Sequence, residues 1–190
     1  MKIPELLAPC GDFDCLVAAV QNGADAVYFG SSLFNARASA TNFDKDNLER
    51  AIDYAKLRGV KTHLTLNTLI KNDEFEQAIE VANMAYSYGI DAIIVQDLGV
   101  AMYLIKNFPG LDVHGSTQMT IHNLSGALEA QELGFKRVVL SREVPISEIK
   151  KICQAVQIEI EAFVHGALCI SYSGQCLFSS IVGRAFWKQR

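Results

Sequence analysis

Two cysteines near the end of the chain are the residues whose type and spacing most clearly suggest chemistry. Six residues separate Cys169 from Cys176, in a stretch that also holds Gly166 and Gly174. Thiolates are ligands for soft metals and iron–sulfur clusters, and glycines let a loop wrap around such a group. Two thiols are only half of a cluster's ligand set, so their spacing alone leaves open that both are ordinary thiols.

A second set of polar residues lies where short apolar runs end. In chain order these residues are Asn67, Gln96-Asp97, the alternating His114, Ser116 and Gln118, then Ser141-Arg142-Glu143, and the alternating Glu161, Phe163 and His165. Residues two apart in a strand share a face, so each alternating trio is expected on one face of its strand. We predict roles in catalysis for Asp97, Arg142, Glu161 and His165, and ligand binding by Asn67, His114, Ser116 and Gln118.

Each of these polar residues also has a purely structural interpretation. A lone strand histidine such as His114 is commonly a hydrogen-bonded core residue. Asp97 could cap a following helix, and Arg142 with Glu143 could form a local ion pair of little energetic value. The gathering of five or six polar strand ends on one rim favours a site for a small polar ligand.

The common hydrolase signatures are missing from the sequence. It contains neither G-x-S-x-G, which marks a nucleophile elbow, nor H-E-x-x-H, which marks a helical zinc site. Cys169 lies four residues from His165, so a Cys–His pair is conceivable, but nothing in the spacing singles it out. These patterns give no positive support for a hydrolase.

A recurring pattern predicts the elements that position these residues. The run that starts Gly23-Ala24-Asp25 has the same form as the run that starts Gly89-Ile90-Asp91, and looser copies start at Gly59 and Gly134. Each copy joins a helix-ending glycine, a charged residue and a short apolar run of strand type. Strands are predicted near 5–9, 25–30, 61–67, 91–96, 112–118, 136–142 and 158–165, with a helix after each of the first six.

Alternating strands and helices of this kind predict a parallel sheet covered by helices. A doubly wound sheet would usually carry a glycine-rich phosphate loop after its first strand, and none is present. A TIM-type (β/α)8 barrel fits the repeat length but typically needs about 250 residues. We therefore predict an α/β barrel of the TIM type that stops after about seven strands, with an open sheet as the alternative.

Composition narrows the class of protein. Half of the 190 residues are hydrophobic, and 17 Lys and Arg against 21 Asp and Glu give a net charge of −4. These values exclude a disordered chain and a domain that binds nucleic acid by bulk positive charge. With no long apolar run and no secretory signal, a cytoplasmic protein is expected. Five cysteines in a reducing compartment argue against a disulfide framework, and Cys15 and Cys153 are interpreted as core residues of helices.

The segment 161–179 closely resembles the signature of the peptidase U32 family, the collagenase-like protease family. Its pattern is E-x-F-x-x-G-(S/A)-hydrophobic-C, a second Cys seven positions on, then hydrophobic-S. The matching residues are Glu161, Phe163, Gly166, Ala167, Cys169, Cys176 and Ser179. The resemblance continues through 5–9, 23–28, 67–68, 96–97, 116–118 and 140–143, and it covers nearly all of the chain to about residue 183.

The resemblance implies an activity that differs from the family name. Similar proteins hydroxylate ribosomal RNA cytidine, transfer RNA wobble uridine or ubiquinone precursors, and carry a 4Fe–4S cluster whose first two ligands match Cys169 and Cys176. The amino-acid sequence of residues 165–169 and 173–176 is most similar to that of the ribosomal RNA 5-hydroxycytidine branch of the family. Ribosomal or transfer RNA is thus the implied partner and prephenate a candidate oxygen donor. A collagenase-like peptidase, as the family name states, is the alternative.

Two departures from the family pattern lead to further expectations. Cys10 stands where relatives usually have alanine, and a barrel would bring it towards Cys169, although a small buried thiol is the simpler interpretation. Relatives also continue with Gly-Asn-Arg-Gly and a C-x-x-x-C pair that supplies the remaining cluster ligands, whereas this sequence reads Trp187-Lys188-Gln189-Arg190. One extra base in the gene would shift the reading frame, so that codons for Gly-Asn-Arg-Gly would be read as Trp-Lys-Gln-Arg.

We therefore hypothesise a frameshifted truncation, with an incomplete barrel domain over 1–183 and an atypical tail over 184–190. The missing ligands predict weak or no cluster binding and impaired activity by this chain. A second alternative is an inactive remnant that only binds a ligand and self-associates through unpaired strand edges.

Overall fold

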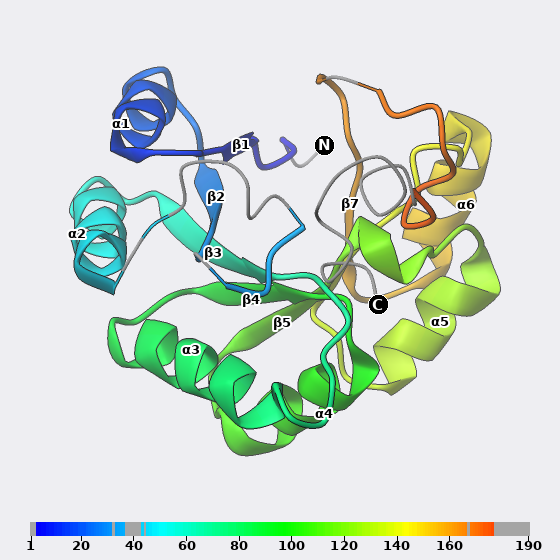
Figure 1. Cartoon of the computed structure of the whole chain (residues 1–190). Helices are drawn as coiled ribbons and strands as arrows, with labels where there is room; N and C mark the ends of the chain where they lie inside the picture. Colours follow the sequence, from blue (N-terminus) through cyan, green and yellow to red (C-terminus); the bar gives the residue numbers. More distant parts are fainter. Residues whose placement is uncertain (1–2, 32, 37–42, 44, 167, 177–190) are drawn as a thin grey trace. The chain divides into compact units, whose positions relative to one another are not determined.

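The computed structural model describes residues 3–31, 33–36, 43, 45–166 and 168–176. Over these residues seven strands alternate with six α-helices, and a 3-10 helix, η1, follows β5 (Figure 1). The strands are hydrogen-bonded in sequence order from β1 to β7. The chain divides into two compact units, Met1–Leu66 with Ile70–Ile94, and Asn67–Leu69 with Val95–Arg190.

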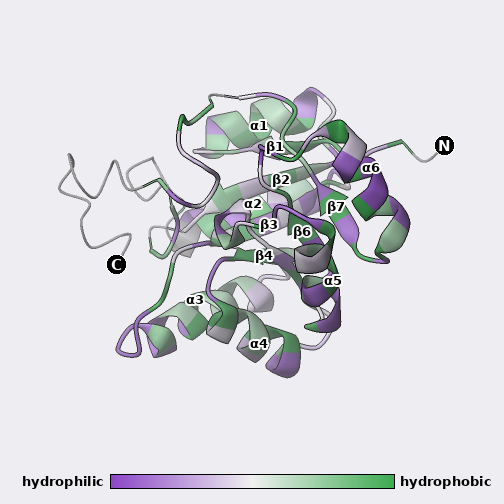
Figure 2. Cartoon of the chain, turned by 90° about the vertical axis from the view of Figure 1, so that its right-hand side faces the viewer, coloured by the Kyte–Doolittle hydropathy of each residue, from purple (hydrophilic) through white to green (hydrophobic). Residues whose placement is uncertain are grey.

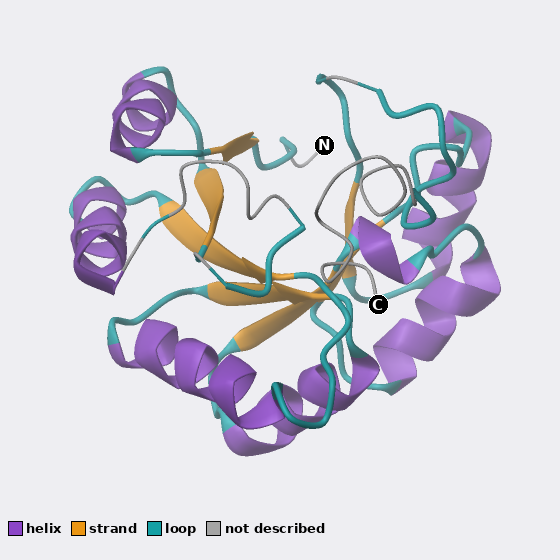
Figure 3. Ribbon diagram, viewed as in Figure 1, coloured by secondary structure: helices purple, strands orange, loops and turns teal. Residues whose placement is uncertain are grey.

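The first unit holds the first half of the alternating elements. They are β1 (Leu7–Pro9), α1 (Phe13–Gln21), β2 (Ala26–Gly30), α2 (Lys45–Lys56), β3 (Lys61–Leu66), α3 (Phe75–Ser87) and β4 (Ala92–Val95), whose last residue belongs to the second unit. β1 pairs in parallel with β2, and β2 with β3, so that Tyr28 lies opposite His63. Figure 3 shows each of these strands followed by a loop or a helix. Leu16, Phe29 and Leu64 are fully buried and mark the core of this unit.

The repeated Gly-x-Asp pattern has a physical explanation in this unit. Gly23 and Gly89 end their helical segments with φ of +87° and +79°, in the left-handed region that favours glycine. The carboxylate of Asp25 then accepts a hydrogen bond from the Leu6 N–H at 2.8 Å. The carboxylate of Asp91 accepts from the Thr62 N–H at 2.8 Å. Each aspartate therefore ties the start of its strand to the backbone at the beginning of the preceding strand or just before it.

The second unit holds the remaining elements. They are α4 (Leu98–Asn107), β5 (Asp112–Gly115), η1 (Thr117–Met119), α5 (Leu124–Glu132), β6 (Arg137–Val139), α6 (Ile146–Ala155) and β7 (Glu159–Glu161). β5 pairs in parallel with β6, and β6 with β7. Figure 2 shows both hydrophilic and hydrophobic residues along α5 and α6, as expected for helices with one buried face. Leu104, Val138 and Ile152 are fully buried in the core.

All seven predicted strands are present, but the predicted lengths of the last three are wrong. β5 ends at Gly115 instead of 118, because the Ser116 hydroxyl accepts a hydrogen bond from the Gln118 N–H at 3.1 Å and starts η1. β6 ends at Val139 and β7 at Glu161. After β6, the backbone N–H of Arg142 donates to the hydroxyl of the loop residue Ser173 instead of to a neighbouring strand. The tail predicted over 184–190 lies outside the described residues.

Candidate functional site

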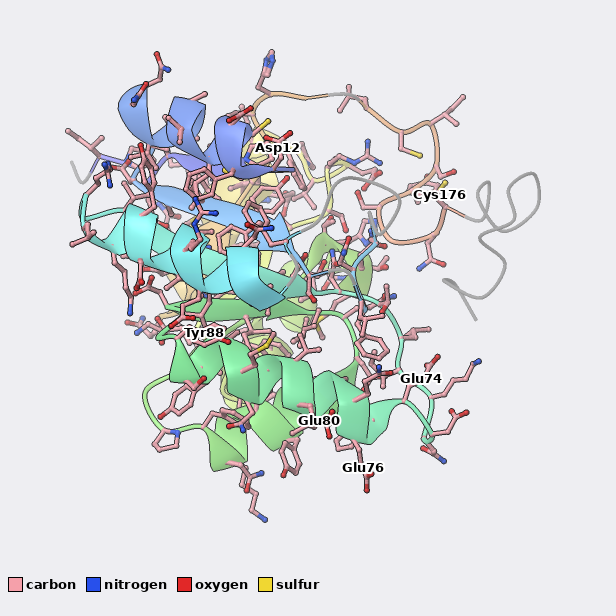
Figure 4. All side chains as sticks on the ribbon, turned by 60° about the vertical axis from the view of Figure 1, so that its left-hand side comes forward. Asp12, Glu74, Glu76, Glu80, Tyr88 and Cys176 are labelled. Atoms are coloured by element: carbon pink, nitrogen blue, oxygen red, sulfur yellow. The ribbon has the colours of Figure 1, made fainter. Side chains whose placement is uncertain are left out.

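The loop that follows β7 carries both cysteines of the predicted metal site. We call residues 168–176 the cysteine loop. Cys169 is exposed and Cys176 is half-buried, and Figure 4 shows the Cys176 side chain on this loop. The N–H of Gln175 donates to the Tyr172 carbonyl at 3.0 Å, which closes a turn between the two cysteines.

The two thiols interact with each other. The backbone N–H of Ser171, the side chain of Cys176 and the Ser171 hydroxyl donate hydrogen bonds to the Cys169 sulfur and lower the pKa of this thiol below its usual value. The positive charge of Arg142 lowers this pKa further. A thiol that loses its proton easily is a better metal ligand and a better nucleophile, because the thiolate is the reactive form.

The side chain of Arg142 makes three hydrogen bonds with the cysteine loop. Its Nη1 donates to the carbonyl oxygen of Cys169 at 3.1 Å, and its Nη2 donates to that of Ser171 at 3.0 Å. Its Nε donates to the Ser173 hydroxyl at 3.2 Å. The ion pair with Glu143, which the sequence left as an alternative, is also present at 3.9 Å. The guanidinium is therefore engaged with the loop that carries the thiols.

Ser173 is the buried anchor of this loop, with 3% of its surface exposed. Its N–H donates to the Glu143 carboxylate at 3.0 Å, and its carbonyl accepts from the Thr120 hydroxyl at 3.3 Å. The same Thr120 hydroxyl accepts from the Gln175 amide at 3.0 Å. Thr120 follows η1 in the left-handed conformation, with φ of +61°, which is uncommon for threonine. Two separate segments, one with Thr120 and one with Arg142 and Glu143, thus hold the loop.

Asp97, Asn67 and His114 follow or lie in the strands where they were predicted. The Asp97 carboxylate accepts from the Val100 N–H at 3.0 Å, so the capping interpretation is confirmed for this residue. His114 lies in β5 and is 2% exposed. Asn67 directly follows β3 and is half-buried. A carboxylate used as a helix cap is held in place, but its capping oxygen is already bonded.

The sequence predicted that Ser116 and Gln118 share a strand face with His114, and this is wrong. Because β5 ends before them, the Ser116 side chain caps η1, and Gln118 lies within that 3-10 helix. The Gln118 carbonyl accepts a hydrogen bond from the Gln96 amide at 3.4 Å. Gln96 after β4 and Gln118 after β5 are therefore brought together through the Gln118 carbonyl. The alternation of side chains along a strand predicts no contact made by a backbone group.

The trio predicted on β7 is also divided. Only Glu161 belongs to the strand, and its carboxylate accepts from Nη1 of Arg137 at 3.3 Å. Arg137, which is 6% exposed, also donates to Glu159 from its Nε at 2.8 Å. Phe163 and His165 lie beyond the strand and are exposed. Glu161 thus has a partner within the sheet, while His165 lies on the loop that leads to the cysteines.

His122 was missed by the sequence reasoning, and it forms the one arrangement that resembles a hydrolytic triad over the described residues. Its Nδ1 lies 3.3 Å from the Ser141 hydroxyl, and its Nε2 lies 3.7 Å from the Glu143 carboxylate. However, Nδ1 is also 2.9 Å from the Thr120 carbonyl. A carbonyl only accepts, so Nδ1 carries the proton and cannot take one from Ser141. Ser141 is also only 2% exposed, so this arrangement does not suit hydrolysis.

Of the other three cysteines, Cys10 is buried, and Cys15 and Cys153 are exposed. Cys10 is 4% exposed, and burial, followed by the charges of Cys15 and Asp12, raises its pKa to about 12. This agrees with the simpler interpretation of a buried thiol. Cys15 and Cys153 were predicted to be core residues, and this is wrong, because both are exposed on their helices. The buried positions beside them are Leu16 and Ile152, since adjacent helix residues point in different directions.

The comparison with known families agrees with the signature that the cysteine loop carries. The model of peptidase family U32 matches residues 11–186. The chain belongs to this family. The predicted resemblance is therefore confirmed, and the match spans both cysteines and residues 141–143, which we call the Arg142 segment.

Relatives in this family carry different names. The chain is 42% identical over 175 residues to a 23S rRNA 5-hydroxycytidine synthase of Escherichia coli, covering 92% of this chain and 26% of the relative. It is 38% identical to the tRNA hydroxylation protein P of Haemophilus influenzae, with coverages of 95% and 40%. It is 36% identical to a protein named collagenase from Porphyromonas gingivalis, with coverages of 92% and 44%. The chain spans less than half of the length of each.

A solved structure of a U32 peptidase has the same fold. Its TM-score is 0.71 at 16% identity, and the likeness covers 90% of this chain and 72% of the other. Together with the sequential order of the strands, this confirms the predicted fold class, an α/β fold of the TIM-barrel type with about seven strands. No helix among the described residues is long and apolar enough to cross a membrane.

Proposed function

We propose that this chain is part of a U32-family protein that hydroxylates a base of RNA, cytidine or wobble uridine, with the help of an iron–sulfur cluster. The observation that carries the proposal is that Cys169 and Cys176 lie on one loop, which Arg142 holds through the carbonyl oxygens of Cys169 and Ser171, and that the two thiols interact. The names of the two relatives that act on RNA support the same reaction class.

The chemistry of the two thiols fits a cluster. Cys169 and Cys176 would be two of its ligands, and the N–H of Ser171 already points to one sulfur, as is common around cluster thiolates. Among the described residues, no group of three or more His, Cys, Asp or Glu side chains is placed to hold a metal ion. Two more ligands would therefore come from outside these residues. When bound, such a cluster would supply electron transfer at the site.

The polar residues near the ends of β4, β5 and β6 would bind the small oxygen donor, for which prephenate remains the candidate. The Gln96 amide, η1 and the Arg142 segment lie in one unit with the cysteine loop. The net charge of −4 favours a local RNA contact over one made by the whole surface. A reaction on RNA would take place in the cytoplasm.

A peptidase is the competing proposal, because one relative is named collagenase. The state of His122 argues against a Ser–His–Glu mechanism, and a thiol mechanism would need His165 to activate Cys169. Cleavage of gelatin that disappears in both Cys169→Ala and His165→Ala variants would favour this alternative.

The test is nucleoside mass spectrometry of ribosomal and transfer RNA from cells with and without the complete gene. We expect one hydroxylated pyrimidine to disappear without the gene and to return with the unaltered gene. The gene encoding Cys169→Ala should fail to restore it, whereas the matched variant Cys153→Ala, an exposed thiol on α6, should restore it. Unchanged nucleosides in cells without the gene would contradict the proposal. Stable dimers without cluster or activity would favour an inactive remnant.

A further inference from the structure

The side chain of Arg142 has three donor nitrogens that all reach the cysteine loop. Nη1 and Nη2 donate to the carbonyl oxygens of Cys169 and Ser171 at 3.1 and 3.0 Å, and Nε donates to the Ser173 hydroxyl at 3.2 Å. A guanidinium is a rigid, planar fork, so three bonds to alternate residues fix the path of the loop between them.

This contact matters because the cysteine loop has little other regular structure. Over its described residues it contains no helix or strand, so no regular hydrogen-bond ladder fixes its backbone, and contacts from side chains elsewhere decide its path. The guanidinium of Arg142 donates to the carbonyl groups of Cys169 and Ser171, near the start of the loop. The peptide between them carries the Ser171 N–H that donates to the Cys169 sulfur. Arg142 therefore orients the backbone donor that faces the first thiol.

A second set of bonds fixes the middle of the loop through Ser173. Its hydroxyl accepts from the backbone N–H of Arg142 at 3.1 Å, and its own N–H donates to Glu143 at 3.0 Å. Arg142 and Glu143, which are adjacent in the sequence after β6, therefore bind the hydroxyl and the N–H of Ser173. Ser173 lies between the two cysteines in the sequence, so fixing it limits how far the thiols can separate.

The closeness of Gly174 to a neighbouring segment indicates a fixed path as well. A Cβ at this position would lie 2.5 Å from Thr120 Oγ1 and 2.8 Å from the Gln118 carbonyl oxygen. The loop is thus packed directly against the backbone after β5, with no space for even a methyl group.

We propose that Arg142 is a positioning residue, which holds the cysteine loop in the shape that presents Cys169 and Cys176 to one metal group. This role differs from the catalytic role that the sequence predicts for Arg142, which stays a prediction. The inference rests on the proposed function, because that function makes the two thiols ligands of one group. It concerns the spacing of the thiols, however, and can be measured without a cluster.

Phenylarsine oxide is a suitable probe, because trivalent arsenic binds two neighbouring thiols together. The background protein carries Cys15→Ser and Cys153→Ser, since these two exposed thiols would compete for the probe. We expect one arsenical per chain in the background, and roughly tenfold weaker binding in Arg142→Gln, because a loop that is not preorganised loses affinity. Arg142→Lys keeps the charge but not the fork, and should lose affinity to a similar extent.

Lys151→Gln on α6 is the matched control, since it removes an exposed cation of the same unit whose ion pair is with Glu148, one turn away on the same helix. It should bind the arsenical like the background. Ser173→Ala serves as a second variant if Arg142→Gln fails to fold, as judged by its melting curve, and should weaken binding in the same direction.

Unchanged affinity in folded Arg142→Gln or Ser173→Ala would overturn the proposal, as would full affinity in Arg142→Lys or no binding in the background. If RNA hydroxylation instead proves independent of the gene while Arg142→Gln still weakens arsenical binding, the proposed function fails and the positioning role stands.

Discussion

The backbone N–H of Ser173 donates to the carboxylate of Glu143 over 3.0 Å, and this bond joins the end of β6 to the loop between the two cysteines. The two residues lie thirty positions apart in the sequence. Glu143 also faces His122 and Arg142, at 3.7 and 3.9 Å. Its charge therefore helps to set the shape of the candidate site.

Acidification should weaken this bond. Partial burial acts to raise the pKa of Glu143, but hydrogen bonds from its own N–H and from Ser173, together with the charge of Arg142, leave this pKa below the usual 4.5. A carboxylate with a lowered folded-state pKa stabilises the fold above its ordinary pKa and loses that contribution as the pH falls through the lowered value. We expect the Ser173 amide resonance to titrate with a midpoint below 4.5, as followed by NMR. A Glu143→Gln variant should show no such titration, and a midpoint above 4.5 in the unaltered chain would contradict the assignment.

The thiols should differ in their reactivity. Hydrogen bonds from Ser171 and Cys176 lower the pKa of Cys169, whereas burial raises that of Cys10 to about 12. A hydrogen bond with Asp12 raises the pKa of exposed Cys15. At neutral pH iodoacetamide should therefore label Cys169 first, Cys15 more slowly and Cys10 last, as measured by peptide mass spectrometry. Unfolding in denaturant is the control, since it should remove these differences. Labelling of Cys15 as fast as Cys169 in the native chain would refute this order.

A side chain at Gly174 should displace the cysteine loop. Gly174→Ala combines a left-handed φ of +79° with the close contact to Thr120. The left-handed conformation alone costs about 1–2 kcal/mol for a residue with a Cβ. We expect faster proteolysis within the loop and weaker arsenical binding, with little change in the melting of the core. Gly11→Ala is the matched control, because no atom lies within 4 Å of the position that its new methyl group would occupy, and its φ is not left-handed. Equal protease resistance of the two variants would contradict the packing of the loop.

The pairing of Arg137 with the two glutamates of β7 should contribute to stability. Arg137→Ala would leave Glu159 and Glu161 side by side without their cation. We expect a loss of about 1–3 kcal/mol in the free energy of unfolding, less than for a fully buried pair because Glu159 is 45% exposed. Denaturant unfolding measures this loss, and the neighbouring exposed Lys136→Ala should change stability by less than about 0.5 kcal/mol. Equal stability of the two variants would count against a structural role for Glu161.

The alternating fold was predictable from the sequence because its signals are local. The glycines at 23 and 89 and the aspartates that follow them act within a few residues of the strands they start. Hydrophobic runs then marked every strand. The ends of the last three strands were not predictable, because a single side-chain bond from Ser116, or a loop partner for Arg142, decides where the ladder stops.

The candidate site was predictable in its cysteines and only partly in its polar groups. The thiols stand out by type and by the U32 signature. The contacts of Arg142 with the cysteine loop span 27 to 31 residues, and no periodic pattern connects positions so far apart. Thr120 had no sequence signal at all, because its role depends on a left-handed backbone that threonine rarely adopts.

The iron and sulfide bound per chain after anaerobic reconstitution show whether Cys169 and Cys176 act as cluster ligands. We compare the unaltered chain with Cys169→Ala, Cys176→Ala and the matched exposed-thiol variant Cys153→Ala. Because Cys169 and Cys176 would be two of the four ligands that such a cluster usually has, we expect the unaltered chain and Cys153→Ala to bind iron and sulfide weakly, below a full 4Fe–4S cluster. Either of the other variants should lose this binding. Iron binding that survives in Cys169→Ala or Cys176→Ala, or a full cluster on this chain, would contradict the account.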